Sequence, residues 1–374
     1  MLQSGVSHPN LGMSNRVNIY YWKCDRPDPF STLGKSCLSD EQAKLDFCIE
    51  KICKDFFKED YVLEKAVGQG NHRNFVVRHN DKPYLIRIES GSDNDDYMVV
   101  ETEMIRRVGQ SGIPVPEILH VDTSRTEIPY AYQIMECLTC PDINTIYKNS
   151  ELDTAEVMKQ LGGYIARWQS LTAEGFGFFD TDLLNAEGSL RGLCGTYPEY
   201  YRLRLDDHLT FLVARGFIGQ QLADEISCLV TEHEHLLDLE SGCLVHKDIA
   251  FWNILGTENE IVSVIDWDDT IMGDPTDDLS LMACYHSWEE LAPMFEGYTA
   301  VKPLTDNFEK RFWLHLLRNM IFKAVIRVGA GYFDKDNNFF LVQSSGANNL
   351  KEFTLSRILA AVEGLKDNFK ITDL

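Results

Sequence analysis

The segment LVHKDIAFWNIL, residues 244–255, is the feature that most constrains what this chain can fold into. His246, Asp248 and Asn253 stand there among large apolar residues. A polar side chain in such surroundings costs free energy unless another group partners it. The fold around this segment must therefore bring partners to these three residues.

The segment belongs to a short mixed region, residues 243–279, which interrupts a mostly helical half of the chain. Before Pro141 the pattern is that of strands with one helix, because runs such as YVLEKAV, FVVRH and YLIRIES are separated by turn residues. After Pro141, apolar residues recur at helical spacing over residues 153–172, 197–215, 219–237, 307–328 and 347–365. We therefore expect an α+β chain with a small antiparallel β lobe followed by a larger, mainly helical lobe.

The boundary between the two lobes is expected near residues 136–142. This places the small lobe at residues 59–140 and the helical lobe at residues 141–374. Residues 1–58 are expected to form an N-terminal extension with one helix, because Ser39 and Gln42 have the spacing of a capping box and apolar residues follow at helical spacing.

The polar residues of the mixed region suit phosphoryl transfer from a nucleotide. That reaction needs a carboxylate that orients the attacking hydroxyl and oxygen ligands for Mg²⁺. Asp248 and Asn253 can supply one carboxylate and one amide from a single turn, and Asp266 follows the apolar run IVSVI. The pattern H-x-D-x(4)-N, followed by a strand that ends in Asp, is typical of the catalytic loop and metal-binding Asp of kinases.

These motifs resemble those of the aminoglycoside phosphotransferase and choline kinase superfamily, small-molecule kinases with a protein-kinase-like, two-lobed fold. The resemblance rests on VHKDIAFWNIL and VIDWDDTIMGDPTDDLS and extends to GIPVPEIL, QIMECL and GFGFF, about residues 60–290. It implies transfer of the γ-phosphate of ATP, or of GTP, to a hydroxyl of a small molecule, with Mg²⁺ as cofactor.

The resemblance also implies roles for individual residues. Asp248 would be the catalytic base, Asn253 and Asp266 would bind Mg²⁺, and His246 and Asp278 would be structural, with Asp278 accepting hydrogen bonds from the backbone of the loop. In the small lobe, Arg87 would contact the nucleotide phosphates and pair with Glu101, or failing that with Glu103. Gly68 and Gly70 would turn the loop that covers the nucleotide, although turns use glycine in any case.

Lys247 departs from the family pattern, in which Gly is common at this position. Next to the expected base, it could contact phosphate or substrate, or extend into solvent. Asp268 and Asp269 are further candidates for contact with the substrate, although acidic loops are more often simply solvated.

The acidic composition bears on the partners of the chain. Asp and Glu number 58 against 35 Lys and Arg, a net charge of −23, which disfavours nucleic acid and anionic membrane surfaces. Six Asp and no Lys or Arg lie between residues 266 and 278. Asp266 is assigned to the metal and Asp278 to the loop, which leaves four carboxylates, those of Asp274 and Asp277 among them, to contact an acceptor. We therefore expect a small hydroxylated amine as acceptor, with a neutral sugar, nucleoside or amino acid as the alternative.

The sequence shows neither a signal peptide nor an apolar run long enough for a transmembrane helix, and its ten cysteines are scattered, so a cytoplasmic protein is expected. Two other functions compete with a small-molecule kinase. A protein Ser/Thr kinase is disfavoured because the triplet at residues 266–268 is Asp-Trp-Asp and no Ala-Pro-Glu motif follows. A nucleotide-binding pseudoenzyme is disfavoured because Asp248, Asn253 and Asp266 are all present.

Overall fold

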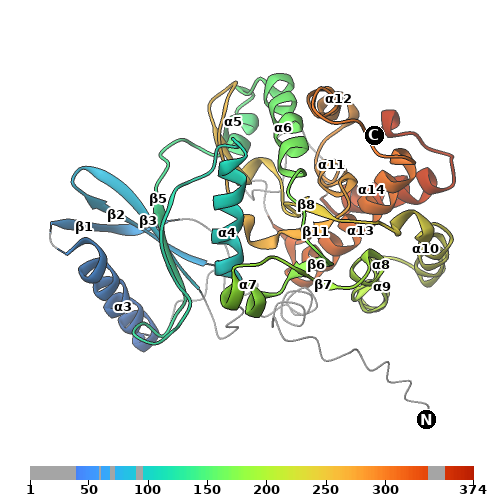
Figure 1. Cartoon of the computed structure of the whole chain (residues 1–374). Helices are drawn as coiled ribbons and strands as arrows, with labels where there is room; N and C mark the ends of the chain where they lie inside the picture. Colours follow the sequence, from blue (N-terminus) through green and yellow to red (C-terminus); the bar gives the residue numbers. More distant parts are fainter. Residues whose placement is uncertain (1–38, 59, 68–71, 90–95, 336–349) are drawn as a thin grey trace, which may run out of the picture.

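The computed structural model describes residues 39–58, 60–67, 72–89, 96–335 and 350–374 of the chain. Figure 1 shows a β-rich lobe at one end, a larger helical lobe at the other, and helix α4 between them. The small-lobe elements are α3 (Ser39–Phe57), β1 (Tyr61–Val67), β2 (His72–His79), β3 (Lys82–Glu89), α4 (Tyr97–Gln110), β4 (Ile118–Asp122) and β5 (Tyr132–Glu136). The α+β class and the order of the lobes agree with the sequence-based prediction.

The small lobe is built on an antiparallel five-stranded sheet with the strand order β1-β2-β3-β5-β4. Apolar residues of β2, β3 and β5 form one buried cluster with the inner face of α3, to which Ile49 and Ile52 belong. Helix α3 therefore packs in the same core as the sheet. Ile86 and Ile88 of β3 face this cluster, so Arg87 between them points to the opposite face.

The helical lobe begins with α5 (Ile143–Lys148) and α6 (Thr154–Trp168). The elements that follow before the mixed region are β6 (Phe176–Phe179), α7 (Thr181–Glu187), β7 (Gly192–Cys194), α8 (Tyr197–Tyr201), α9 (Leu205–Ala214), α10 (Gln220–Glu232) and the 3₁₀ turn η1 (Glu234–Leu237). A single helix over residues 197–215 is therefore a wrong prediction. A capping box of Thr196 and Glu199 starts α8, and Arg204, with a left-handed φ of 59°, separates it from α9.

The mixed region contains β8 (Cys243–Val245), η2 (Phe251–Asn253), β9 (Ile254–Gly256), β10 (Ile261–Val264), η3 (Trp267–Asp269) and β11 (Ile271–Gly273). After it come α11 (Thr276–Met282), α12 (Trp288–Thr299), α13 (Phe308–Gly329), η4 (Tyr332–Asp334), α14 (Leu350–Leu365) and η5 (Ile371–Asp373). Helix α12 was not expected from the sequence. Among the described residues, no helix is both long and apolar enough to cross a membrane.

Helix α4 fixes the position of the small lobe against the helical lobe. Its buried residues, such as Val100 and Met104, belong to the hydrophobic cluster of the helical lobe. The Tyr97 hydroxyl donates to the carbonyl of Thr270 at 3.1 Å and accepts the backbone N–H of Phe179 at 3.1 Å. Residues on α4 therefore keep a defined position relative to the mixed region.

Candidate active site

The loop between β8 and β9 carries the expected base and is held by one buried carboxylate. Asp278 accepts the backbone N–H groups of His246 at 2.9 Å and Lys247 at 3.0 Å, as expected from the sequence. Its Oδ2 atom also accepts the indole N–H of Trp168 at 3.0 Å. These three hydrogen bonds connect the loop to α11 and α6, so the loop is rigidly placed.

His246 is a structural residue of this loop. It is fully buried beside Trp267, its Nε2 atom lies 3.0 Å from the carbonyl of Ile265, and its Nδ1 atom lies 3.3 Å from the backbone nitrogen of Asp248. The second contact needs an acceptor, which assigns the ring proton to Nε2. Burial lowers the pKa of His246 to about 4, so the ring is neutral near pH 7.

Asp248 and Asn253 contact each other directly. The Asn253 amide donates to the Asp248 carbonyl at 2.8 Å and to its Oδ2 atom at 3.1 Å. Lys323 of α13 lies on the other side, with its Nζ atom 3.6 Å from Oδ1 of Asp248. Burial raises the pKa of Asp248, and Lys323 opposes that rise.

Asp266 lies where the two lobes meet. It follows β10 with a left-handed φ of 66°, and its Oδ1 atom is 3.3 Å from Nη2 of Arg87. Arg87 pairs with buried Glu101 of α4 and contacts Nδ1 of His72 at 3.1 Å. Glu103 pairs with arginines on its own helix, so of the two expected partners the structure brings Glu101 to Arg87.

The residues around Asp266 concentrate negative charge. Burial and the carboxylates of Asp268, Glu101 and Asp248 raise the pKa of Asp266 well above its usual value, and Arg87 offsets this only in part. The described residues hold no group of three His, Cys, Asp or Glu side chains that could by itself bind a metal ion. An amide and a carboxylate in an over-negative site nevertheless fit Mg²⁺, which takes few protein ligands when nucleotide phosphates supply others.

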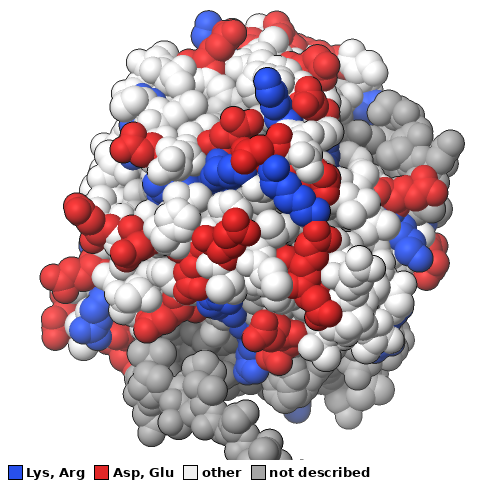
Figure 2. All heavy atoms as spheres, turned by 90° about the vertical axis from the view of Figure 1, so that its right-hand side faces the viewer, with Lys and Arg blue, Asp and Glu red and all other residues white. Residues whose placement is uncertain are grey.

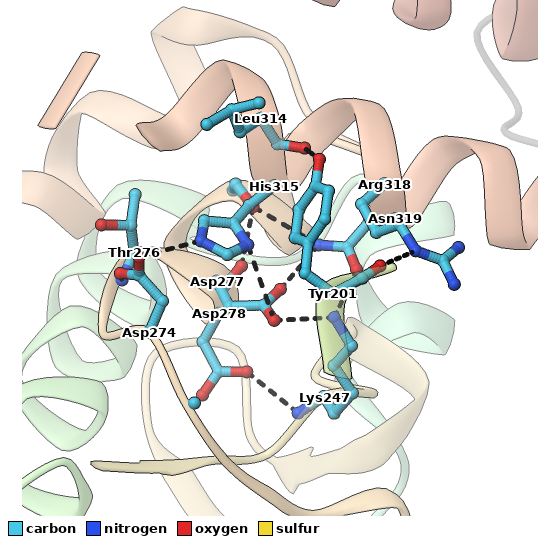
Figure 3. A network of polar contacts seen from close by, with 12 residues as sticks. Tyr201, Lys247, Asp274, Thr276, Asp277, Asp278, Leu314, His315, Arg318 and Asn319 are labelled. Carbon is cyan, nitrogen blue, oxygen red and sulfur yellow. Dashed lines mark hydrogen bonds and ion pairs between the residues drawn. The ribbon is translucent and has the colours of Figure 1, made fainter. Parts of the chain in front are cut away.

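Two of the aspartates that were expected to face an acceptor do not. Asp274 is fully buried and pairs with Arg311, with 2.6 Å between Nη2 and Oδ2, and with His315 Nε2 at 3.0 Å. Asp277 is also fully buried and pairs with Lys247 at 2.7 Å (Figure 3). The expectation of four available carboxylates is therefore wrong, because the fold uses these two to bind cations inside the lobe.

Lys247 has a structural partner. Its Nζ atom donates to Asp277 Oδ2 at 2.7 Å and to Asn319 Oδ1 at 2.8 Å, so the side chain does not extend into solvent (Figure 3). Its φ of 68° lies in the left-handed region that favours glycine, so Lys247 stands there against the preference of the backbone. Gly68 and Gly70 lie outside the described residues.

A cavity of about 30 Å³ adjoins Asp248 on the helical-lobe side. Lys247 and Asp248 border it from the loop, Leu281 from α11, and three tyrosines from α8, namely Tyr197, Tyr200 and Tyr201. The remaining lining residues come from α13 and are His315, Arg318, Asn319, Phe322 and Lys323. Asp268 and Asp269 do not line this cavity. We call it the acceptor-side cavity.

The contribution of α13 was not predicted from the sequence. Its five cavity residues follow the spacing i, i+3, i+4, i+7, i+8, so they share one face of the helix. Four of the five are polar, and such a polar stripe is a signal that the sequence does contain. Without the fold, however, the sequence does not indicate which helix lies against the loop that carries Asp248.

Comparisons with known proteins gave one family match and several structures with a similar fold. A family model described as "Phosphotransferase enzyme family" matches residues 64–306, and no curated protein matches the chain. The fold is similar to the crystal structure of aminoglycoside phosphotransferase APH(4)-Ia, with a TM-score of 0.59 and 16% identity over 85% of this chain and 99% of that chain. It is also similar to a putative fructosamine-3-kinase from Haemophilus somnus 129PT, with a TM-score of 0.55 and 12% identity over 84% of this chain and 96% of that one.

At these identities the structural likeness establishes the protein-kinase-like fold, while the family match covers well over half of the chain. It includes both lobes and every expected site residue of the mixed region. The chain therefore belongs to the phosphotransferase enzyme family and is a phosphotransferase that acts on an alcohol group.

Proposed function

We propose that the protein transfers the γ-phosphate of ATP, or of GTP, to a hydroxyl of a small molecule held on the helical-lobe side of Asp248. The observation that carries this proposal is the convergence of two groups of residues from different lobes. Asp248, Asn253 and Asp266 meet the Arg87–Glu101 pair through the contact between Arg87 and Asp266.

Each residue has a role in this proposal. Asp248 accepts the proton of the attacking hydroxyl, and its contact with the Asn253 amide holds its carboxylate in one orientation. Arg87, fixed by Glu101, donates to phosphate oxygens of the nucleotide, for which its planar guanidinium is well suited. Asn253 and Asp266 would bind Mg²⁺, which neutralises phosphate charge when it is bound.

Solved relatives with this fold support a nucleotide donor and a small acceptor. A mutant of APH(4)-Ia, similar to this chain with a TM-score of 0.60, was crystallised as a ternary complex with AMP-PNP and hygromycin B. An amine-bearing acceptor of that kind is the class expected from the acidic sequence, with a neutral metabolite as the alternative. Burial of Asp274 and Asp277 removes much of the reason to prefer an amine.

The test is phosphate transfer by the full-length protein, supplied with Mg-ATP or Mg-GTP and a panel of small hydroxylated compounds, and measured as a mass increase of the acceptor. Asp248→Asn is the first variant, because it keeps the shape of the side chain and removes the base. We expect its kcat to fall by about 10²–10⁴-fold, the usual contribution of a general base, while nucleotide affinity is retained. A variant with nearly unchanged turnover would remove Asp248 from the mechanism.

A further inference from the structure

The charged groups that line the acceptor-side cavity are mainly cationic, in contrast to the acidic surface of the chain. Lys247, Arg318 and Lys323 border it, whereas Asp248 is its one lining carboxylate among the described residues. His315 also lines it and stands between the buried carboxylates of Asp274 and Asp277. The net charge of the whole chain is therefore no guide to the charge that this cavity accepts.

The three cations are held in place by the fold. Lys247 uses two of the three donors of its ammonium for Asp277 and Asn319, which leaves one donor for a ligand. Arg318 donates to the carbonyls of Tyr201 at 2.9 Å and Leu203 at 2.7 Å, so its guanidinium is fixed without losing its charge. Lys323 lies over the ring of Tyr285, 5.0 Å from its centroid, and beside Asp248.

Lys247 and Lys323 are each paired with a carboxylate, Asp277 and Asp248, whereas Arg318 donates to backbone carbonyls. The positive charge of Arg318 therefore disfavours an ammonium placed beside it. A carboxylate at the same place would gain charge-assisted hydrogen bonds. Repulsion from Asp248 is limited if the acceptor directs its hydroxyl, rather than its anionic group, toward that residue.

The cavity of about 30 Å³ is small and partly open, so it has room for one carboxylate while the rest of the acceptor extends out of it. The tyrosine rings of α8 form one wall, and the hydroxyls of Tyr197 and Tyr201 donate away to Asp277 and to the carbonyl of Leu314. The cationic donors that can recognise an oxyanion come from the loop and from α13.

We propose that the acceptor is a small hydroxy acid, with its carboxylate in the acceptor-side cavity toward Lys247 and Arg318 and its hydroxyl toward Asp248. This inference rests on the proposed kinase function and names the substrate class of the same site. Lys247 is then a specificity residue that favours an anionic acceptor over a neutral or cationic one.

The test uses compounds that share a polyol skeleton and differ in charge. Glycerate, glycerol and 3-amino-1,2-propanediol form one set, and gluconate, sorbitol and glucamine form another. Binding to the full-length protein with Mg²⁺ and AMP-PNP is measured by the shift in Tm and by calorimetry, so that no turnover is needed. We expect the carboxylate of at least one set to bind about tenfold or more tightly than its neutral match, and the amine to bind most weakly.

Variants then connect this preference to the cavity. Lys247→Gln removes one charge from the cavity, and Lys159→Gln, on the exposed face of α6, is the matched control. The ratio of carboxylate to polyol affinity should fall about tenfold in Lys247→Gln and stay unchanged in Lys159→Gln. Lys323→Gln provides a second measurement should Lys247→Gln fold poorly, and it should lower the same ratio.

Three results would overturn the inference: tighter binding of the neutral or amine compound, no binding of any compound, or a ratio that neither cavity variant changes. In each case the proposed kinase function stands as long as Mg²⁺ and AMP-PNP still raise the Tm of the wild-type protein. If Mg²⁺ and AMP-PNP do not raise the Tm of the wild-type protein, the proposed kinase function is itself contradicted.

Discussion

Lys247 combines an unfavourable backbone conformation with a favourable ion pair of its side chain. A non-glycine residue in the left-handed region costs about 1–2 kcal/mol. The same residue supplies the ammonium that pairs with Asp277, a carboxylate with no exposed surface. Burial opposes ionisation of Asp277, but Lys247 and His315 lower its pKa below the usual value.

Lys247→Gly separates these two effects. The backbone would relax, but a buried carboxylate would lose its partner, and breaking one side of a buried ion pair usually costs about 3–5 kcal/mol. We therefore expect a net loss of unfolding free energy of about 2 kcal/mol in urea titrations at pH 7. The double variant Lys247→Gly with Asp277→Asn should recover part of that loss, since no charge is then left unpaired. A double variant less stable than Lys247→Gly would show that the loss of the ion pair does not cause the lower unfolding free energy.

Asp266 and Asn253 allow a second prediction at this scale. Both variants, Asp266→Ala and Asn253→Ala, should require more Mg²⁺ to bind ATP, and Asp266→Ala should be the more affected because it loses a charge as well as a ligand. The measurement is nucleotide affinity over a Mg²⁺ titration. Unchanged magnesium dependence in Asp266→Ala would exclude this residue as a ligand.

At the scale of elements, helices α6 and α12 cross with their backbones in close contact. A Cβ atom on Gly162 would lie 1.9 Å from the carbonyl oxygen of Met294, and one on Gly297 would lie 1.9 Å from that of Lys159. The two glycines therefore allow backbone contact. Because α6 also carries Trp168, which donates to Asp278, this crossing helps to place the loop of Asp248.

Gly162→Ala should therefore destabilise the protein by about 1–3 kcal/mol, the usual cost of overpacking a core. Its neighbour offers a matched control, since a Cβ on Gly163 would meet only the Gly297 carbonyl oxygen at 3.8 Å. Gly163→Ala should be neutral or stabilising by up to about 1 kcal/mol, because alanine favours the helix. Equal effects of the two substitutions in urea unfolding would contradict the close crossing.

The elements also show what the sequence could and could not predict. Asp248 and Asn253 lie in one loop and Asp266 follows the next strand, so their association was predictable from local spacing. The pairing of Arg87 with Glu101 was implied by the family resemblance, with Glu103 as the alternative, and the structure brings Arg87 and Glu101 together. Lys323 is 75 positions beyond Asp248 in the sequence numbering, and its place beside the loop depends on how α13 packs, which periodicity alone does not determine.

At the scale of the whole molecule, the acidity of the chain and the charge of its site are separate properties. Figure 2 shows acidic side chains spread over the outer face of the helical lobe with basic ones among them. Inside the lobe, aspartates are instead bound to Arg311, Lys247 and the ring of His315. The prediction of an amine acceptor assumed that the carboxylates of residues 266–278 are exposed. That assumption is wrong because α11 packs against α13 and Asp274 and Asp277 are buried.

Buried histidines connect this packing to the pH dependence of global stability. His208 of α9 has no exposed surface and lies beside Arg318 of α13, with 3.3 Å between its Nδ1 atom and Nη1. Burial, and after it the charge of Arg318, lowers the pKa of His208 to about 2. In the unfolded chain a histidine has a pKa of about 6.5, so the unfolded state binds one more proton than the folded state below that pH.

The stability that His208 contributes as a neutral group should therefore be complete above about pH 6.5 and be lost progressively as the pH falls toward 2. Between pH 7.5 and pH 5 this residue alone should lower the unfolding free energy by about 2 kcal/mol. His208→Gln cannot take up that proton in either state, so its unfolding free energy should fall by about 2 kcal/mol less than that of the wild type over the same interval. Urea titrations at both pH values measure the difference, in which contributions from the other titratable groups cancel. Equal losses in the two proteins would mean that His208 gains a proton in the folded state, and the contact between α9 and α13 would then have to rearrange to admit a second cation beside Arg318.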